Sequence, residues 1–365
     1  MITAFDQSPQ RINPVPPDVR EHLEAEKIRS SVHSTSGQGG YIELSRQIKN
    51  AGLFSTRNHS DVPKMALNAC FLLAGWIAFF LVGNSWYQLI VAFYMAVAFT
   101  QTAFVGHDLG HRQTSRSPRA NQAIGMIHVN LLLGMSFSWW IGKHNRHHAY
   151  PNQEGKDPDI ATGAFIWSKA QSLDRRGFRR FLARYQAVLF FPMLLLEALH
   201  LHFASIRSLA SRSDRTRIAE AMLIGLHALL YFTAIFTVLS PLRAVVFIAV
   251  QQGLFGLYLG CAFAPNHKGM QILENGDQTD FLKRQVCTAR NVRGGWLVDH
   301  ALGGLNYQIE HHLFPTMPRH KLRHSRPIVK AFCESQGLAY VEVPLLGSYV
   351  QIVRYLHSVG APLRN

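Results

Sequence analysis

Apolar residues in this chain collect into stretches of about twenty residues, and most charged residues lie between these stretches or near the two ends. Four of the stretches are long enough to cross about 30 Å of hydrocarbon as α-helices. They form two pairs, each joined by a short turn: residues 65–83 with 86–105, and residues 218–239 with 243–264. We therefore predict four transmembrane helices arranged as two hairpins.

Two further apolar stretches, residues 120–141 and 187–205, carry polar side chains near their centres, among them Asn130 and His200. Because polar groups are costly inside a bilayer, we predict that both stretches form interfacial or re-entrant helices. The first stretch is long enough to affect the membrane topology, because a straight helix of this length would be about 33 Å long. As a crossing, it would place the segments before and after it on opposite sides of the membrane.

Charge predicts the orientation of these helices. About sixteen Lys and Arg residues lie between residues 107 and 217, whereas the two hairpin turns carry only Arg243. Cytoplasmic loops are rich in Lys and Arg, so we predict that the long connecting region and both termini face the cytoplasm. The net charge of +15 raises the alternative of nucleic-acid binding. Basic residues beside apolar spans are better explained by anionic lipid headgroups, so we expect a lipid bilayer as partner and no nucleic acid.

These patterns together predict an all-α integral membrane protein with four transmembrane helices in two hairpins, interfacial helices and a cytoplasmic, histidine-rich cap. We expect three regions: a polar N-terminal cytoplasmic segment over residues 1–60, a membrane domain with the metal site over residues 61–325, and a C-terminal cytoplasmic segment over residues 326–365. The first region is polar and contains Pro14, Pro16 and Pro17, so no cleavable signal peptide is expected.

Three short clusters contain seven of the nineteen histidines. They read HDLGH at residues 107–111, HNRHH at residues 144–148 and QIEHH at residues 308–312. On a helix, residues three or four apart share a face, so the histidines of one cluster can direct their imidazoles at a common point. The candidate metal ligands in these clusters are His107, His111, His144, His147, His148, His311 and His312.

The number of candidate ligands indicates more than one metal ion. Imidazole binds iron, copper, nickel and zinc, and a ligating histidine usually donates its other ring proton to a carboxylate or carbonyl. Asp108, Asp157 and Glu310 are close enough in sequence to be such partners. A structural zinc site needs four ligands and a catalytic one three, so seven histidines indicate two metals. Di-iron sites in soluble four-helix bundles rely on glutamates, whereas these clusters offer histidines.

The three clusters, in this order and beside the predicted spans, resemble the three histidine boxes of the membrane fatty acid desaturase superfamily, over about residues 65–325. The third box, NYQIEHHLFP at residues 306–315, opens with Gln308 and resembles front-end desaturases and bacterial acyl-CoA or acyl-lipid desaturases. The resemblance implies a fatty acid desaturase, an oxidoreductase that uses two iron ions and O2 to introduce a double bond into a long acyl chain and releases water. The expected substrate is a long-chain acyl-CoA or acyl-lipid.

The resemblance also implies an eighth histidine ligand in the linker after the last crossing, and His267 occupies that position. Asn266 is then a candidate water-mediated ligand. Gln308 stands where other members have the first histidine of the third box. It is therefore a candidate to bind iron weakly, to bind it through water, or to orient a neighbour. No catalytic group beyond the metal ligands is expected.

Three further expectations concern partners and alternatives. The sequence shows no flavin, nicotinamide, Fe–S or heme-binding motif, so electrons are expected from an external donor: a ferredoxin, cytochrome b5 or flavin reductase. One alternative is a hydroxylase or monooxygenase of the same superfamily. Another, from a different class, is a non-catalytic membrane protein that binds a transition metal. A transporter would place polar ligands within its spans, whereas these boxes fall at span ends.

Overall fold

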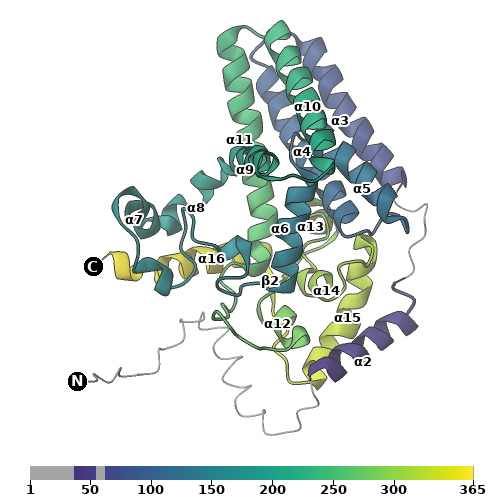
Figure 1. The fold of residues 1–365 in the computed structure, drawn as a ribbon, viewed down its shortest axis with the longest axis vertical. Coiled ribbons are helices and arrows are strands. Elements are labelled where there is room, and N and C mark those ends of the chain that lie inside the picture. Colours follow the sequence, from purple (N-terminus) through teal and green to yellow (C-terminus); the bar gives the residue numbers. More distant parts are fainter. Residues whose placement is uncertain (1–36, 55–61, 365) are drawn as a thin grey trace.

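A computed structural model describes residues 37–54 and 62–364 of the chain (Figure 1). Most of this part is helical. Its only strands are β1 (Asn291–Arg293) and β2 (Glu342–Pro344), which pair in parallel. The predicted all-α class is confirmed. The segment expected over residues 1–60 lies outside the described residues, except for residues 37–54, which include α2 (Gly37–Asn50).

Four long apolar helices form the upper bundle in Figure 1: α3 (Val62–Val82), α4 (Gln88–Gly110), α10 (Thr216–Val238) and α11 (Pro241–His267). Each is long and apolar enough to cross a membrane, which confirms the predicted number of spans. Two of these helices end later than predicted, and one of them is α4, which continues past residue 105 to Gly110. The fourth, α11, continues past residue 264 to His267, so this histidine ends the last long helix and does not lie in a linker after it.

The two hairpin turns meet at one end of the bundle. Gly83 adopts a left-handed backbone conformation (φ 62°) and ends the first helix of its hairpin, where the amide of Gln88 donates to the carbonyl oxygens of Phe79 and Gly83. At the other turn, the backbone N–H of Ser240 donates to the side chain of Asn84. The opposite end of the bundle is therefore where α4 and α11 deliver their last residues to the cap.

The stretch over residues 120–141 does not form one straight helix. It contains α5 (Pro118–Met126), a π-helical turn η1 (Ile127–Leu131) and the start of α6 (Phe137–Ala149). Between η1 and α6 the chain turns at Gly134, whose φ of 71° favours glycine. Because of this reversal, the stretch does not place the segments before and after it on opposite sides of the membrane. α6 lies at the same end of the bundle as the last turn of α4.

The second stretch that we predicted to be interfacial or re-entrant, residues 187–205, is also broken. It forms α8 (Gln186–Leu194) and α9 (Glu197–Ser211), which are bent by 71° relative to each other. By length and composition the two together are either one broken span or a re-entrant loop. The second of these possibilities matches the predicted re-entrant character.

The remaining elements form a cap around the lower ends of α4 and α11 (Figure 1). The cap elements not yet given are α7 (Gly177–Arg184), α12 (Phe281–Cys287), α13 (Trp296–Ala301), α14 (Gln308–Leu313), α15 (Arg319–Ser335), α16 (Leu345–Val359), and the 3-10 turns η2 (Pro158–Ile160), η3 (Ala170–Ser172) and η4 (Ala361–Leu363). Apolar side chains of α2, α12, α14 and α15 build the core of the cap, for example Leu44, Leu282, Ile309 and Val329.

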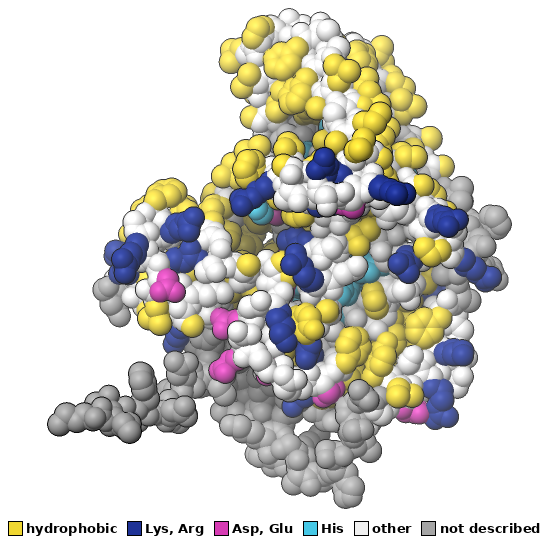
Figure 2. All heavy atoms as spheres, viewed as in Figure 1, with side chains coloured by type: hydrophobic (Ala, Val, Ile, Leu, Met, Phe, Trp, Pro, Cys, Tyr) yellow, Lys and Arg dark blue, Asp and Glu magenta, His cyan; other side chains and the backbone are white. Residues whose placement is uncertain are grey.

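The surface follows this division. Hydrophobic side chains cover the upper bundle, and Lys and Arg side chains gather below it (Figure 2). Leu81 and Ile90 of the bundle, for example, are largely exposed in the isolated chain. Such a contiguous apolar surface is unfavourable in water and suits hydrocarbon. The expected regions 61–325 and 326–365 remain a prediction, and α15 runs across residue 325.

Candidate metal centre

Four helices deliver the predicted ligands to one place. The last turn of α4 carries His107 and ends at His111, and the second half of α6 carries the second box. α11 ends on His267, and the short helix α14 carries His311 and His312. Because successive helical residues point about 100° apart, the two adjacent histidines of α14 face different neighbours. The eight side chains consequently divide into two clusters.

The first cluster consists of His107, His111, His144 and His311, which offer ring nitrogens within 4.8 Å of one another. The ring centroid of His107 lies 4.7 Å from those of His111 and His311. The Nε2 atoms of His111 and His144 are 2.9 Å apart. The Nε2 atoms of His107 and His311 are buried, with no hydrogen-bond partner in the described part of the chain.

The second cluster consists of His147, His267 and His312, all buried. The Nε2 atom of His267 lies 3.3 Å from Nε2 of His147 and 3.0 Å from Nε2 of His312. The eighth histidine, His148, lies between the clusters. Its ring stacks on His312 at 4.1 Å between centroids, and its Nε2 is 3.1 Å from Nε2 of His144.

These distances fit metal ions. Two imidazole nitrogens bound to one metal at about 2.1 Å lie about 3.0–3.4 Å apart, and the closest Nε2 pairs of each cluster are 2.9–3.3 Å apart. A ring nitrogen offers either one proton or one lone pair. Nε2 of His267 therefore cannot satisfy His147, His312 and the nearby amide of Gln308 at once. A cation at each meeting point satisfies these nitrogens together.

The outer ring nitrogens of the second cluster are held by hydrogen bonds. Nδ1 of His147 lies 3.0 Å from a carboxylate oxygen of Asp157, Nδ1 of His267 lies 3.0 Å from the carbonyl of Thr288, and Nδ1 of His312 lies 2.8 Å from Oε1 of Gln285. If each Nδ1 carries the proton, each Nε2 presents its lone pair towards the common centre. This is the tautomer that metal binding requires.

Burial keeps most of these rings neutral. Loss of water, followed by the repulsion of neighbouring histidines, sets the pKa well below its usual range for the rings of His111, His144, His148, His311 and His312. Burial also acts to lower the pKa of His147, but the carboxylates of Asp157 and Asp159 outweigh it and raise that pKa. A more basic imidazole is a stronger metal ligand.

The three predicted carboxylates have different surroundings. Asp157 is fully buried and faces His147. Asp108 lies 3.6 Å from Nδ1 of His107 and pairs with Arg319 at 3.1 Å. Glu310 instead accepts hydrogen bonds from the side chains of Asn291 and Tyr340. These contacts fix α14 against the rest of the cap.

The two predicted amide candidates lie at the second cluster. Nε2 of Gln308 is 2.8 Å from Nε2 of His267, and the amide oxygen of Gln308 is buried without a partner among the described residues. Asn266 precedes His267, and its side-chain oxygen is likewise buried and unpartnered in that part of the chain. Each thus has an unpartnered oxygen at or beside His267, a candidate metal ligand.

Several residues that support the centre carry no local sequence signal. Arg290 is fully buried and donates to the carbonyl oxygens of Pro265 and Lys268, on either side of His267. Its positive charge also complements the C-terminal end of α11. Asn152 donates to the carbonyl of His267 from another loop. Only the folded chain brings these residues, and Gln285, to the ligands.

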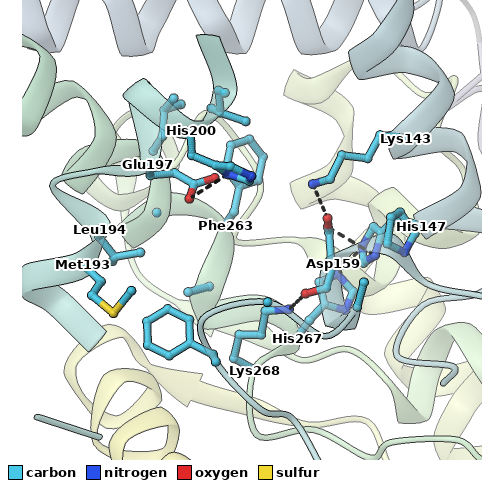
Figure 3. A pocket seen from close by; sticks show the side chains of 18 of the residues that line it. Lys143, His147, Asp159, Met193, Leu194, Glu197, His200, Phe263, His267 and Lys268 are labelled. Carbon is cyan, nitrogen blue, oxygen red and sulfur yellow. Dashed lines mark hydrogen bonds and ion pairs between the residues drawn. The ribbon is translucent and has the colours of Figure 1, made fainter. Parts of the chain in front are cut away.

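A cavity of about 510 Å³ adjoins both clusters. Its wall reaches His144 of the first cluster and His147 and His267 of the second, and most of its lining is apolar, including Phe165, Trp167, Phe190, Leu194, Leu259 and Phe263. Figure 3 shows the polar side chains at this wall, where Asp159 pairs with Lys143 and accepts through its backbone from Lys268. Sequence reasoning missed this pair of lysines around one carboxylate.

Comparison with known proteins gives consistent matches. The family described as fatty acid desaturase matches residues 84–344. An acyl-lipid (9-3)-desaturase of Physcomitrium patens is 34% identical over 276 residues, which are 73% of this chain and 52% of the relative. A fatty acid desaturase 2-like protein of Mus musculus is 27% identical over 89% of this chain and 67% of its own length. A delta(8)-fatty-acid desaturase of Helianthus annuus is 26% identical over 89% and 74%.

This chain spans about half to three quarters of the length of these relatives. The family match includes all three histidine boxes and His267, and it covers well over half of the chain. Together with four apolar helices and the gathered histidines, it shows that the chain belongs to the fatty acid desaturase family.

Proposed function

We propose that this protein is a fatty acid desaturase that introduces a double bond into a long acyl chain, carried as an acyl-CoA or an acyl-lipid. The observation that carries the proposal is the cavity, because one largely apolar space touches histidines of both clusters. An acyl chain is apolar and flexible. Selecting one pair of methylenes requires a wall that holds the chain in a fixed position beside the oxidising centre.

The histidines fit two iron ions, His107, His111, His144 and His311 at one and His147, His267 and His312 at the other, with His148 between them. Bound iron, with O2 as co-substrate, would supply the oxidising power that unactivated C–H bonds need and that acid–base side chains lack. The hydrogen-bonded Nδ1 atoms hold the rings of the second cluster in place. The aromatic side chains of the cavity, such as Phe190 and Phe263, bind the acyl chain and exclude water.

The proposal includes partners and sidedness. Electrons come from an external carrier: a ferredoxin, cytochrome b5 or flavin reductase. The metal centre lies at the bundle end opposite the two hairpin turns, and Lys and Arg gather at that end (Figure 2). The positive-inside tendency therefore supports a cytoplasmic centre with both termini on the same side.

The test is product analysis. Wild-type protein and the His147→Ala variant are expressed with a matched reductase, and cellular fatty acids are derivatised and examined by gas chromatography and mass spectrometry. We expect a new unsaturated species that is absent from the variant and retained in His357→Ala, which replaces an exposed histidine that belongs to neither cluster. A hydroxylated product would assign a monooxygenase. No product, with a stoichiometric metal other than iron, would assign a non-catalytic metal-binding protein.

A further inference from the structure

A ridge of exposed aromatic side chains lies outside the metal centre, on α7 and the residue that follows it. Phe178 is 73% exposed, Phe181 51% and Tyr185 42%. The rings contact in sequence, with centroids 6.1 Å apart between Phe178 and Phe181 and 5.0 Å apart between Phe181 and Tyr185. The spacing of three and four residues places all three on one face of the helix. The described chain leaves this face uncovered.

The same segment is strongly basic. Residues 173–185 contain five arginines and one carboxylate, Asp174. Four of the arginines are exposed: Arg176, Arg179, Arg180 and Arg184. The fifth, Arg175, is buried and donates to the carbonyl oxygens of Gly163 and Phe165, so it fastens α7 to the loop that lines the cavity. The exposed positive charge favours contact with an anionic partner, and the exposed aromatic side chains favour contact with an apolar one.

The apolar side of this arm continues the apolar surface of the bundle. α7 packs on α8, and α8 continues into α9, whose outer side chains Leu199, Phe203 and Ile206 are largely exposed. In Figure 2, hydrophobic side chains lie along the upper edge of the arm that α7 forms, on the side of the hydrophobic bundle, and Lys or Arg side chains lie beneath them. One continuous surface thus joins α7 to the part of the protein that faces lipid.

We propose that α7 lies in the plane of the membrane surface, with Phe178, Phe181 and Tyr185 inserted at the boundary between headgroups and acyl chains and with its arginines bound to anionic headgroups. Short amphipathic helices with aromatic residues on one face and Lys or Arg on the other bind membranes in this way. Arginine side chains lay their apolar stems along the surface and keep their charge at the headgroups. Continuity with the lipid-facing surface favours the bilayer over a protein partner.

This contact has a consequence for the cavity. α7 leads directly into α8, whose Phe190, Met193 and Leu194 line the cavity, and Arg175 holds the adjoining lining loop of Gly163 and Phe165. A lipid-bound α7 therefore keeps this wall of the cavity beside the membrane surface. The inference rests on insertion of the bundle into a membrane and does not depend on the reaction proposed above.

The test measures depth in the bilayer. A nitroxide is attached to Phe178→Cys or to Asp174→Cys in full-length protein that lacks the exposed Cys70, and the protein is placed in nanodiscs of phosphatidylcholine alone or mixed with phosphatidylglycerol. Collisions with O2, which dissolves in the bilayer, and with a water-soluble nickel chelate are measured by power saturation. We expect the O2-to-nickel ratio to be severalfold higher at residue 178 than at residue 174, and higher with the anionic lipid. Signal from the Cys70→Ser protein alone is subtracted.

Charge reversal supplies the second arm. R179E/R180E is expected to bring residue 178 towards the ratio of residue 174 in anionic nanodiscs, whereas K283E/R323E, an equal charge change at exposed cap residues, leaves it unchanged. Equal nickel access at residues 178 and 174 in both lipids would overturn the proposal. A label at residue 178 that is shielded from both reagents would also overturn it, because that result indicates contact with protein.

Discussion

His147 illustrates how single residues define the centre. Its Nδ1 faces Asp157, and its Nε2 faces His267, so the outer contact fixes which nitrogen is free for a metal. Asp157 is in turn held by the backbone N–H groups of Asn152 and Asp159. The carboxylate therefore has little freedom, and neither has the ring it orients.

Replacing this carboxylate should weaken metal binding without removing a ligand. In Asp157→Asn the side chain still has an oxygen for His147, but it loses the negative charge that makes the imidazole a better ligand. We expect metal affinity to fall about 10–100-fold, measured as iron retained during chelator titration. Glu310→Gln is the matched control, because this equally buried carboxylate contacts Asn291 and Tyr340. Equal retention by wild type and Asp157→Asn would contradict the assigned role.

The ligands and their supports differ in how far sequence predicts them. Box spacing predicts His107 with His111 and His144 with His148, because helical periodicity acts over four residues. Asp157 follows from proximity along the chain. Gln285, Arg290 and the carbonyl of Thr288 reach the centre only after α11, α12 and β1 pack together. No local pattern encodes such long-range contacts. Glu310, also a candidate because of its proximity along the chain, contacts Asn291 and Tyr340.

The shape of the cavity depends on how closely α11 approaches α8 and α9. A Cβ atom on Gly256 would lie 2.7 Å from the backbone N of Ala198 and from the carbonyl oxygen of Leu194. Backbone atoms cannot move aside as a side chain can. On Gly253 a Cβ atom would find its nearest neighbour, a methyl group of Leu195, at 3.6 Å. Gly256 thus allows the close approach of α11 to α8 and α9, whereas Gly253 has space for a methyl group.

The two glycines give a matched pair of variants. Gly256→Ala should separate α11 from the α8–α9 break and cost about 1–3 kcal/mol of stability, because overpacking forces backbone shifts. Gly253→Ala should be close to neutral. Thermal unfolding in detergent measures both midpoints. Equal midpoints would show that the helices do not pack as described.

A buried carboxylate of α10 holds the start of α6, the helix that carries the second histidine box. Glu220 of α10 is fully buried, accepts from the hydroxyl of Ser136 and the N–H of Ser138 at the start of α6, and pairs with Arg212 at 3.2 Å. Acceptors at this position satisfy the free N–H groups of a helix N-terminus.

Removing that carboxylate should leave its donors unsatisfied. We expect Glu220→Leu to destabilise the protein by about 1–3 kcal/mol and Glu220→Gln to recover part of the loss, as measured by denaturant unfolding in detergent. Glu334→Leu, at an exposed position of α15, is the control. Unchanged stability of Glu220→Leu would refute the capping role.

For the whole molecule, hydropathy predicted the number of spans well, because length and apolar content alone determine which helices can cross a bilayer. Hydropathy alone could not predict that α5 and η1 fold back before α6, because the turn at Gly134 interrupts a continuous apolar stretch. The polar side chains near the centre of that stretch, such as Asn130, predicted that it does not form a straight crossing. That reversal, and the extension of α11 to His267, bring all eight histidines to one end.

The proposed orientation can be tested with reporter fusions. A green fluorescent protein fused after residue 365 should fluoresce, and alkaline phosphatase at the same point should be inactive, because we propose that the C-terminus is cytoplasmic. Insertion of each reporter at the Asn84 turn should give the reverse pattern, since that turn lies at the far end of the bundle. An active phosphatase after residue 365 would contradict the proposed orientation.

Metal counting shows whether the eight histidines form a two-metal centre. Protein purified from iron-supplemented cells is analysed by mass spectrometry for metals, as wild type and as His107→Ala and His312→Ala, one substitution in each cluster. We predict two iron ions per wild-type chain and a loss of iron in both variants. A single metal per wild-type chain, unaffected by one of the two substitutions, would show that the histidines do not form two metal sites.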